Sequence, residues 1–220
     1  MKTPSLLWAL LALQFAGAAS AGLAINQTFN ESTAIPEGNP VPTPFGQTFS
    51  GLPSGPITSV EVDLDITGGY NGGLYAYLTL QEANGATATE VLLNQIGTTA
   101  STPLGSSGQG MNVTLSDAGT VNGSIHGAAG VPTGVWLPDS AYTLSGTFGG
   151  LTANGTWTLS VADLLNGGGA STLGSWGLRV GVAAVPEAGT ACAGLAAGLL
   201  VLAAHACRGR KTLRRTRARP

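Results

Sequence analysis

A strict alternation of apolar and acidic side chains is the feature that most constrains how this chain can fold. In residues 60–66, which read VEVDLDI, every even position is apolar and every odd position is acidic. A β-strand places successive side chains on opposite faces, so a period of two produces one buried face and one solvated face. We therefore predict a half-buried strand at residues 60–66.

Four further segments repeat this period of two. Their apolar positions are Leu74, Ala76, Leu78 and Leu80; Met111, Val113 and Leu115; Trp157, Leu159 and Val161; and Trp176, Leu178, Val180 and Val182. Glycine-rich segments such as 67–73 and 166–169 separate them and favour turns over helices. With no convincing helical period between the two termini, the sequence predicts an all-β fold, an antiparallel β-sandwich. The proline-rich residues 22–47 are either a linker or an irregular first edge strand.

Charge is distributed unevenly along the 220 residues. Seven of the nine basic residues lie between positions 208 and 219, whereas residues 22–184 contain ten acidic residues and one base, Arg179, a formal charge of −9. A nucleic-acid-binding domain needs a basic surface. We therefore exclude nucleic acid as a partner of residues 22–184.

The N-terminus is typical of a secretory signal peptide. Residues 1–21 combine a basic start at Lys2, an apolar run at 6–13, and small residues at Ala19 and Ala21. Signal peptidase cleaves after such a small-x-small site, so we expect cleavage after Ala21 and export of the protein.

The C-terminal residues 185–220 are predicted to contain a transmembrane helix. Residues 188–207 hold no acid and no permanently charged base, and a helix of that length spans about 30 Å, the thickness of the hydrocarbon layer. The basic tail, residues 208–220, would then lie on the cytoplasmic side. We therefore predict an exported protein that a single C-terminal helix anchors before processing, and that is afterwards located at the cell surface or in an extracellular matrix.

Five segments within residues 30–182 resemble a known family. They are 35–39 (IPEGN), 62–66 (VDLDI), 70–78 (YNGGLYAYL), 154–163 (NGTWTLSVAD) and 173–180 (LGSWGLRV). They resemble the P domain, the jelly-roll accessory domain of subtilisin-like proprotein convertases, and the resemblance implies a β-sandwich that works beside a serine peptidase. The family usually carries His-Thr and Asp where this chain has Gly68, Gly69 and Gly73. These glycines supply no side chain to any polar or ion site that the family builds at this turn.

A second resemblance lies at the C-terminus. Val185, Pro186 and Glu187 precede the apolar span and the arginine-rich tail, in the order of a PEP-CTERM sorting signal. Ala188 stands where that signal usually has a second proline. The resemblance implies a bacterial protein whose partner is an exosortase-type membrane peptidase, with cleavage within or just after residues 185–187.

The sequence offers no catalytic constellation. A serine peptidase needs a nucleophile, a histidine base and an orienting acid, whereas residues 22–184 hold one histidine, His126, in a segment typical of a solvated loop. Glu61, Asp63 and Asp65 share one strand face at about 7 Å spacing, but with no predicted cleft beside them they do not indicate a glycoside hydrolase. We therefore predict no catalytic residue and no enzymatic activity.

Calcium is the one cofactor that the composition suggests. Ca²⁺ takes roughly six to eight oxygen ligands, many of them carboxylates, and Asp65, Asp117 and Asp163 each lie at a predicted strand end or turn. These three are the candidate calcium ligands; the alternative is that the acids keep an exported protein soluble. Tyr75 and Tyr77 either stack on sugar rings or cover a face of a sheet.

Two functions follow from these patterns. The first is an exported, non-catalytic binding or structural protein of the cell surface or of an exopolysaccharide matrix, with polysaccharide as a partner. The alternative is a protease-associated module that assists a separate subtilisin-like serine peptidase.

Overall fold

The computed structural model describes residues 22–184. The predicted signal peptide with Ala19 and Ala21, and the sorting motif of Val185, Pro186 and Glu187, lie outside the described residues. Cleavage at either end, and sorting by an exosortase-type peptidase, therefore stay predictions.

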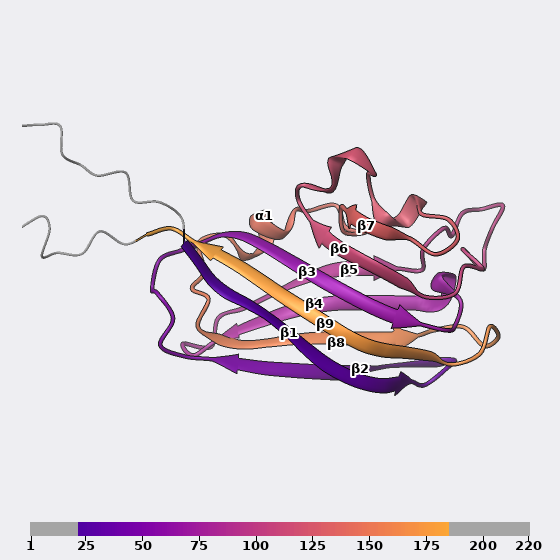
Figure 1. Ribbon diagram of the computed structural model, residues 1–220, viewed down its shortest axis with the longest axis horizontal. Coiled ribbons are helices and arrows are strands. Elements are labelled where there is room, and N and C mark those ends of the chain that lie inside the picture. The colour runs from indigo at the N-terminus through magenta and orange to yellow at the C-terminus, as the bar shows by residue number, and fades with distance from the viewer. Residues whose placement is uncertain (1–21, 185–220) are drawn as a thin grey trace, which may run out of the picture. The chain divides into compact units, whose positions relative to one another are not determined.

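Nine strands form two sheets (Figure 1). In the first sheet the strands lie in the order β1 (Gly22–Ile35), β9 (Ser171–Val182), β3 (Ile57–Thr67), β6 (Met111–Ser116) and β7 (Thr133–Trp136). In the second the order is β2 (Asn39–Phe49), β8 (Gly155–Asp163), β4 (Leu74–Glu82) and β5 (Thr87–Asn94). Every pairing is antiparallel except that of β6 with β7. The predicted all-β sandwich is confirmed.

Short helical segments lie in the connections. One is the α-helix α1 (Leu144–Phe148), and three are 3₁₀ turns, η1 (Asn71–Gly73), η2 (Gly119–Val121) and η3 (Ile125–Gly127). None of these segments exceeds five residues, so none could produce a helical period that the sequence would reveal.

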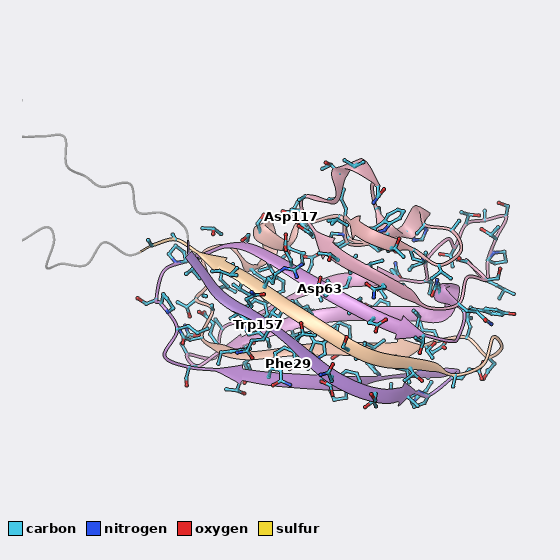
Figure 2. The ribbon with its side chains drawn as sticks, viewed as in Figure 1. Phe29, Asp63, Asp117 and Trp157 are labelled. Carbon is cyan, nitrogen blue, oxygen red and sulfur yellow. The ribbon has the colours of Figure 1, made fainter. Side chains whose placement is uncertain are left out.

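The predicted faces of the strands are the observed ones. In β3 the apolar residues of the alternation are buried and the acids face outward, as the period of two requires. The two tryptophans of the late strands, Trp157 and Trp176, are both 0% exposed. Trp157 packs against Phe148 with ring centres 5.2 Å apart, and Trp176 packs against Phe29 at 4.8 Å. Figure 2 labels Trp157, which belongs to this interior, and Phe29, which is partly buried and packs against it.

Residues 22–47 belong to the sandwich and are not a linker. They fold into β1 and most of β2, which are edge strands of the two different sheets. Both pairings contain register shifts, so the alternative of an irregular edge strand is the correct one. Pro40, Pro42 and Pro44 all lie in β2, where the lack of an N–H group is tolerated because one side of the strand has no neighbour.

The strand β5 did not stand out in the sequence, and its geometry explains why. Its pairing with β4 shifts between Ala76 and Tyr77, so that Leu92 and Leu93 are both buried. A bulge of this kind interrupts the period of two on which the prediction relied. The same shift leaves Glu90 on the buried side of the strand.

No helix within residues 22–184 is long and apolar enough to cross a membrane. The predicted localisation, an exported protein held by a C-terminal membrane helix, is corrected on this finding. The segment 188–207, to which that helix was assigned, lies outside the described residues.

Candidate functional site

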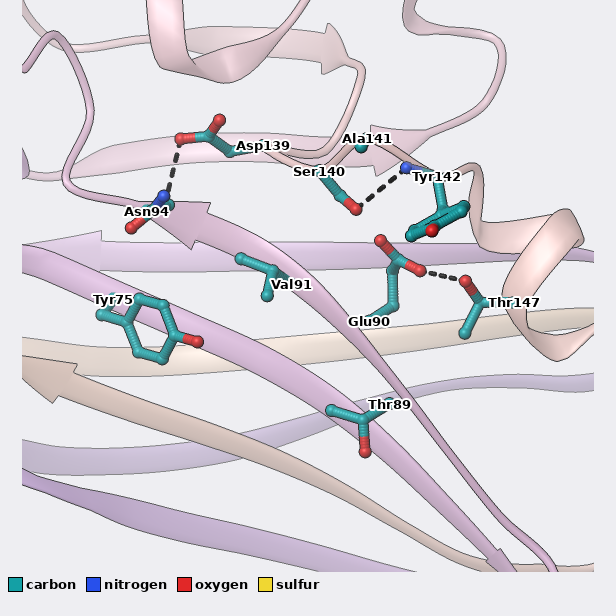
Figure 3. Close-up of a pocket in the computed structure, with 10 residues that line it drawn as sticks. All are labelled: Tyr75, Thr89, Glu90, Val91, Asn94, Asp139, Ser140, Ala141, Tyr142 and Thr147. Carbon is teal, nitrogen blue, oxygen red and sulfur yellow. Dashed lines mark hydrogen bonds between the residues drawn. The ribbon is translucent and has the colours of Figure 1, made fainter.

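A pocket of about 700 Å³ lies at the edge of the second sheet, around the edge strand β5 (Figure 3). It is bordered by β4, by the segment after β7 and by α1. The side chains that give it chemical character are two tyrosines, two acids and a threonine: Tyr75, Tyr142, Glu90, Asp139 and Thr147. The pocket therefore combines aromatic surface with negative charge.

Hydrogen bonds to β5 position the segment that closes this pocket. The backbone N–H of Asp139 donates to the carbonyl of Leu92 at 3.0 Å. In return the N–H of Asn94 donates to Asp139 Oδ2 at 3.2 Å, the bond drawn in Figure 3. These two bonds fix residues 139–142 beside the end of β5, where the bulge has turned Glu90 inward.

Glu90 is the unusual residue of the pocket. It is 3% exposed, and its Oε2 accepts a hydrogen bond from the Thr147 hydroxyl on α1. Its Oε1 is buried and has no hydrogen-bond partner within residues 22–184. In Figure 3 the carboxylate points toward the segment that carries Ser140 and Tyr142. A buried carboxylate oxygen without a donor is costly, because the water that solvated it has not been replaced.

The only lysine or arginine within residues 22–184 lies elsewhere. Arg179 donates from Nε to Glu61 Oε2 at 2.7 Å, and from its two terminal nitrogens to the Asp63 carboxylate at 2.6 and 3.0 Å. These groups lie on the outer face of the first sheet, where Figure 2 labels Asp63. The described residues therefore offer Glu90 no permanent positive charge.

This arrangement also answers whether the acids of β3 form a hydrolytic pair. Glu61 and Asp63 share one guanidinium, and each accepts a further hydrogen bond from a hydroxyl of β6. The carboxylate of Asp65, the third acid, has no hydrogen-bond or ion-pair partner within the described residues. Glycoside hydrolysis needs one acid that holds a proton and one free carboxylate around the substrate. A carboxylate pair locked by an arginine does not provide that combination.

His126 is more tightly held than the sequence indicated. Its Nδ1 lies 2.8 Å from Asp139 Oδ2 and its Nε2 lies 2.9 Å from the carbonyl oxygen of Thr98. The hydrogen bond with Asp139, and then the one with Thr98, raise the pKa of His126, because both acceptors favour the doubly protonated ring. The expectation of a solvated loop histidine was wrong, since nothing in the local sequence reveals partners 13 and 28 positions away.

The histidine–aspartate pair resembles two thirds of a catalytic triad, but the third position is filled. In a triad the Nε2 atom faces a nucleophilic hydroxyl. Here Nε2 faces a backbone carbonyl, which cannot act as a nucleophile of that kind. The pair instead joins three connections: the one after β5, the one that contains η3 and the one after β7.

The three aspartates predicted as calcium ligands lie in three separate places. Asp117 follows β6 and accepts from the N–H groups of Leu144 and Ser145 at 2.8 and 2.9 Å, so that it caps α1 (Figure 2). Asp65 lies opposite Asn112 in the register of β3 with β6, which puts it about 16 Å from Asp117 along the strands. Asp163 belongs to the other sheet.

No group of three or more metal-ligating side chains occurs in the part of the chain that the structure describes. Asp163 is 1% exposed and accepts a hydrogen bond from the Ser171 hydroxyl at 3.1 Å. Burial raises the pKa of the Asp163 carboxyl. The three aspartates therefore do not form one site, and calcium binding stays a prediction.

Asp163 and Ser171 fill the space at the glycines that depart from the P-domain pattern. A Cβ atom on Gly73 would lie 2.3 Å from Asp163 Oδ1, and one on Gly69 would lie 1.9 Å from the Ser171 hydroxyl. Gly69 also has a φ of +59°, a backbone conformation that other residues rarely adopt. Side chains at these two positions are thus excluded by the packing of the strands behind them.

Comparison with known proteins gives distant matches. No protein-family model matches the chain, and no curated protein is significantly similar to it. A structure of the Aeromonas sobria serine protease in complex with the chaperone ORF2 matches 76% of this chain and 28% of that chain, with 19% identity and a TM-score of 0.45. The structure of the serine protease of Aeromonas sobria alone matches 74% of this chain and 27% of that chain, also with 19% identity and a TM-score of 0.45. This chain thus spans little more than a quarter of the length of each matched chain.

Proposed function

We propose that residues 22–184 form a non-catalytic binding module that assists a separate subtilisin-like serine peptidase. The observation that carries the proposal is the position of the two most specific P-domain-like segments. Residues 154–163 lie along β8, between β2 and β4, and residues 173–180 lie within β9, between β1 and β3. These two segments are therefore inner strands of the two sheets, and their tryptophans are buried in the interior.

The proposal that the module is non-catalytic is supported by the contacts of the residues that could otherwise have been catalytic. The only histidine within residues 22–184 uses both ring nitrogens in bonds that hold loops together. Two of the three acids of β3, Glu61 and Asp63, are paired with Arg179. These roles are structural, and they leave the pocket at β5 as a place for binding.

Affinity capture tests the proposal. The full-length chain, carrying an affinity tag, is incubated with an extract of its native host, and the retained proteins are identified by mass spectrometry. We expect a subtilisin-like peptidase to be retained by the wild-type chain and lost with Trp157→Ala, in which the interior is disrupted. Retention of no peptidase by the folded wild-type chain would contradict the proposal.

A second candidate function, polysaccharide binding, is favoured by one observation. Tyr75 and Tyr77 lie side by side on the outer face of β4, with ring centres 6.0 Å apart and planes tilted by 56°. Partly exposed tyrosine rings offer apolar faces on which sugar rings can pack. Co-sedimentation with the host's own polysaccharide, lost in the Tyr75→Ala/Tyr77→Ala double variant, would favour this function over the first.

A further inference from the structure

We infer that the pocket beside β5 binds a positively charged side chain, arginine or lysine, of a protein partner, with Glu90 as its counter-charge. The inference rests on the proposed function as a binding module and names the chemistry that the module recognises.

The first observation that supports this inference is the burial of Glu90. A carboxylate that is 3% exposed has given up nearly all of its hydration, and the described residues replace it at Oε2 alone, through Thr147. Glu90 lines the pocket, and its atom Oε1 is buried and has no donor within residues 22–184. A donor that enters the pocket would therefore gain a hydrogen bond for which the protein has already lost the solvation.

The donor must come from outside residues 22–184, and charge favours a cation. Arg179 is bonded to Glu61 and Asp63 on the other sheet. Asp139 adds a second carboxylate to the same pocket, and its Oδ2 is paired with His126 Nδ1, so Glu90 is the acid of the pocket that has no basic partner within residues 22–184. Residues 22–184 as a whole have a formal charge of −9, which attracts a basic partner over longer distances.

The aromatic residues of the pocket favour an organic cation over a metal ion. Tyr142 is 74% exposed and lines the same pocket as Glu90, as Figure 3 shows. An ammonium or guanidinium group gains energy from the face of an aromatic ring, and the aliphatic part of its side chain packs on the same surface. A metal ion would instead need several ligands in one place, and the described residues contain no group of three or more His, Cys, Asp or Glu side chains that could hold one.

The position of the pocket suits the side chain of a protein. β5 is an edge strand, so one of its sides has no neighbouring strand. Residues 139–142 already bond to this edge at Leu92 and Asn94, so an extended segment of a partner would lie along the preceding residues 87–91 and direct one side chain into the adjoining pocket. We therefore expect the cation to be carried by a polypeptide and not by a free small amine.

The test uses two probes that differ only in charge. N-acetyl-arginine methylamide and N-acetyl-citrulline methylamide have nearly the same shape, and only the first carries a positive charge. Each is titrated into the isotopically labelled full-length chain, and the amide signals of residues 89–94 and 139–147 are followed by NMR. We expect saturable shifts with the arginine probe, and at least about tenfold weaker binding of the citrulline probe, because a desolvated carboxylate loses its ionic partner. Equal binding of the two probes, no saturable shift with arginine, or a response to Ca²⁺ in place of arginine would overturn the inference.

Three variants complete the test. Glu90→Gln and Tyr142→Ala should each weaken binding of the arginine probe, and the second changes an exposed residue, so it cannot act through misfolding of the interior. Asp65→Asn removes one negative charge from the other sheet and should leave the binding unchanged. Undiminished binding by Glu90→Gln would overturn the inference.

The experiments distinguish an error in the inferred arginine-binding site from an error in the proposed function. A chain that retains a peptidase but does not bind the arginine probe would contradict this inference alone. A chain that binds the arginine probe in a Glu90-dependent way but retains no peptidase would contradict the proposed partner and support the site.

Discussion

The buried charge of Glu90 destabilises the unliganded protein. A neutral side chain of the same shape would reduce this destabilisation. Glutamine can still accept the hydrogen bond from Thr147 while removing the buried charge. We expect Glu90→Gln to raise the stability of the free protein by about 1 kcal/mol at neutral pH, seen as a higher melting temperature. A lower melting temperature would show that the carboxylate is already compensated in the folded chain.

His126 makes the stability of the folded protein depend on pH, with its stabilising contribution present at acidic pH and lost at higher pH. Its pKa is raised in the folded state, so the contribution of the protonated ring is fully present below the unfolded value of about 6.5. That contribution is lost as the pH rises through the higher folded pKa. We expect the difference in melting temperature between wild type and His126→Gln to be largest at acidic pH and to shrink toward alkaline pH.

The comparison with His126→Gln isolates this histidine from other titrating groups. Asp163 also has a raised pKa, but both proteins contain it, so its effect cancels in the difference. A difference that is constant with pH, or that grows toward alkaline pH, would contradict the hydrogen-bonded arrangement with Asp139 and Thr98.

At the scale of elements, α1 depends on an acid that the sequence had assigned to calcium. Asp117 accepts two backbone N–H groups of the first turn, and the hydroxyl of Ser145 as well. We expect Asp117→Ala to cost about 1–2 kcal/mol of stability, as the loss of a helix cap does, and to weaken binding of the arginine probe because α1 carries Thr147. Thermal melts in calcium and in chelator should give the same loss. A loss that appears only in calcium would instead assign Asp117 to a calcium site.

The strands were predictable where one face is buried along the whole strand. In β3, β4, β6, β8 and β9 a run of apolar residues recurs at every second position, so a period of two and a buried face could be obtained from the sequence. These runs are 60–66, 74–80, 111–115, 157–161 and 176–182. β7 is four residues long and mostly exposed, which is too short and too polar to show a pattern. β5 contains a bulge, and the pattern ends there.

The candidate site could not be predicted, because it is assembled from segments far apart in the sequence. Glu90 and Thr147 are separated by 57 positions, and no local pattern relates them. The excess of acids and the single base of residues 22–184 were visible in the sequence, but not which acids are buried. The burial of Glu90 depends on the pairing of β5 with β4, which no local pattern reveals.

At the scale of the whole molecule, the sandwich depends on the two tryptophans of its central strands. Both are 0% exposed, and each packs against a phenylalanine. We expect Trp157→Ala and Trp176→Ala each to cost about 3–5 kcal/mol, a large part of the stability of a domain of this size. Tyr142→Ala, which removes an exposed aromatic ring, serves as the control and should leave the melting temperature nearly unchanged. A tryptophan variant that melts within a few degrees of wild type would contradict the packing of that strand.

The affinity of the full-length chain for the captured host peptidase is the most direct test of the function proposed for this fold. It should be measured by titration calorimetry for wild type, Glu90→Gln and Asp65→Asn. We predict that wild type and Asp65→Asn bind with equal affinity, and that Glu90→Gln binds at least about tenfold more weakly because it lacks the counter-charge in the pocket. Absence of binding by the folded wild-type chain would contradict the central proposal, that this sandwich is a binding module for a serine peptidase.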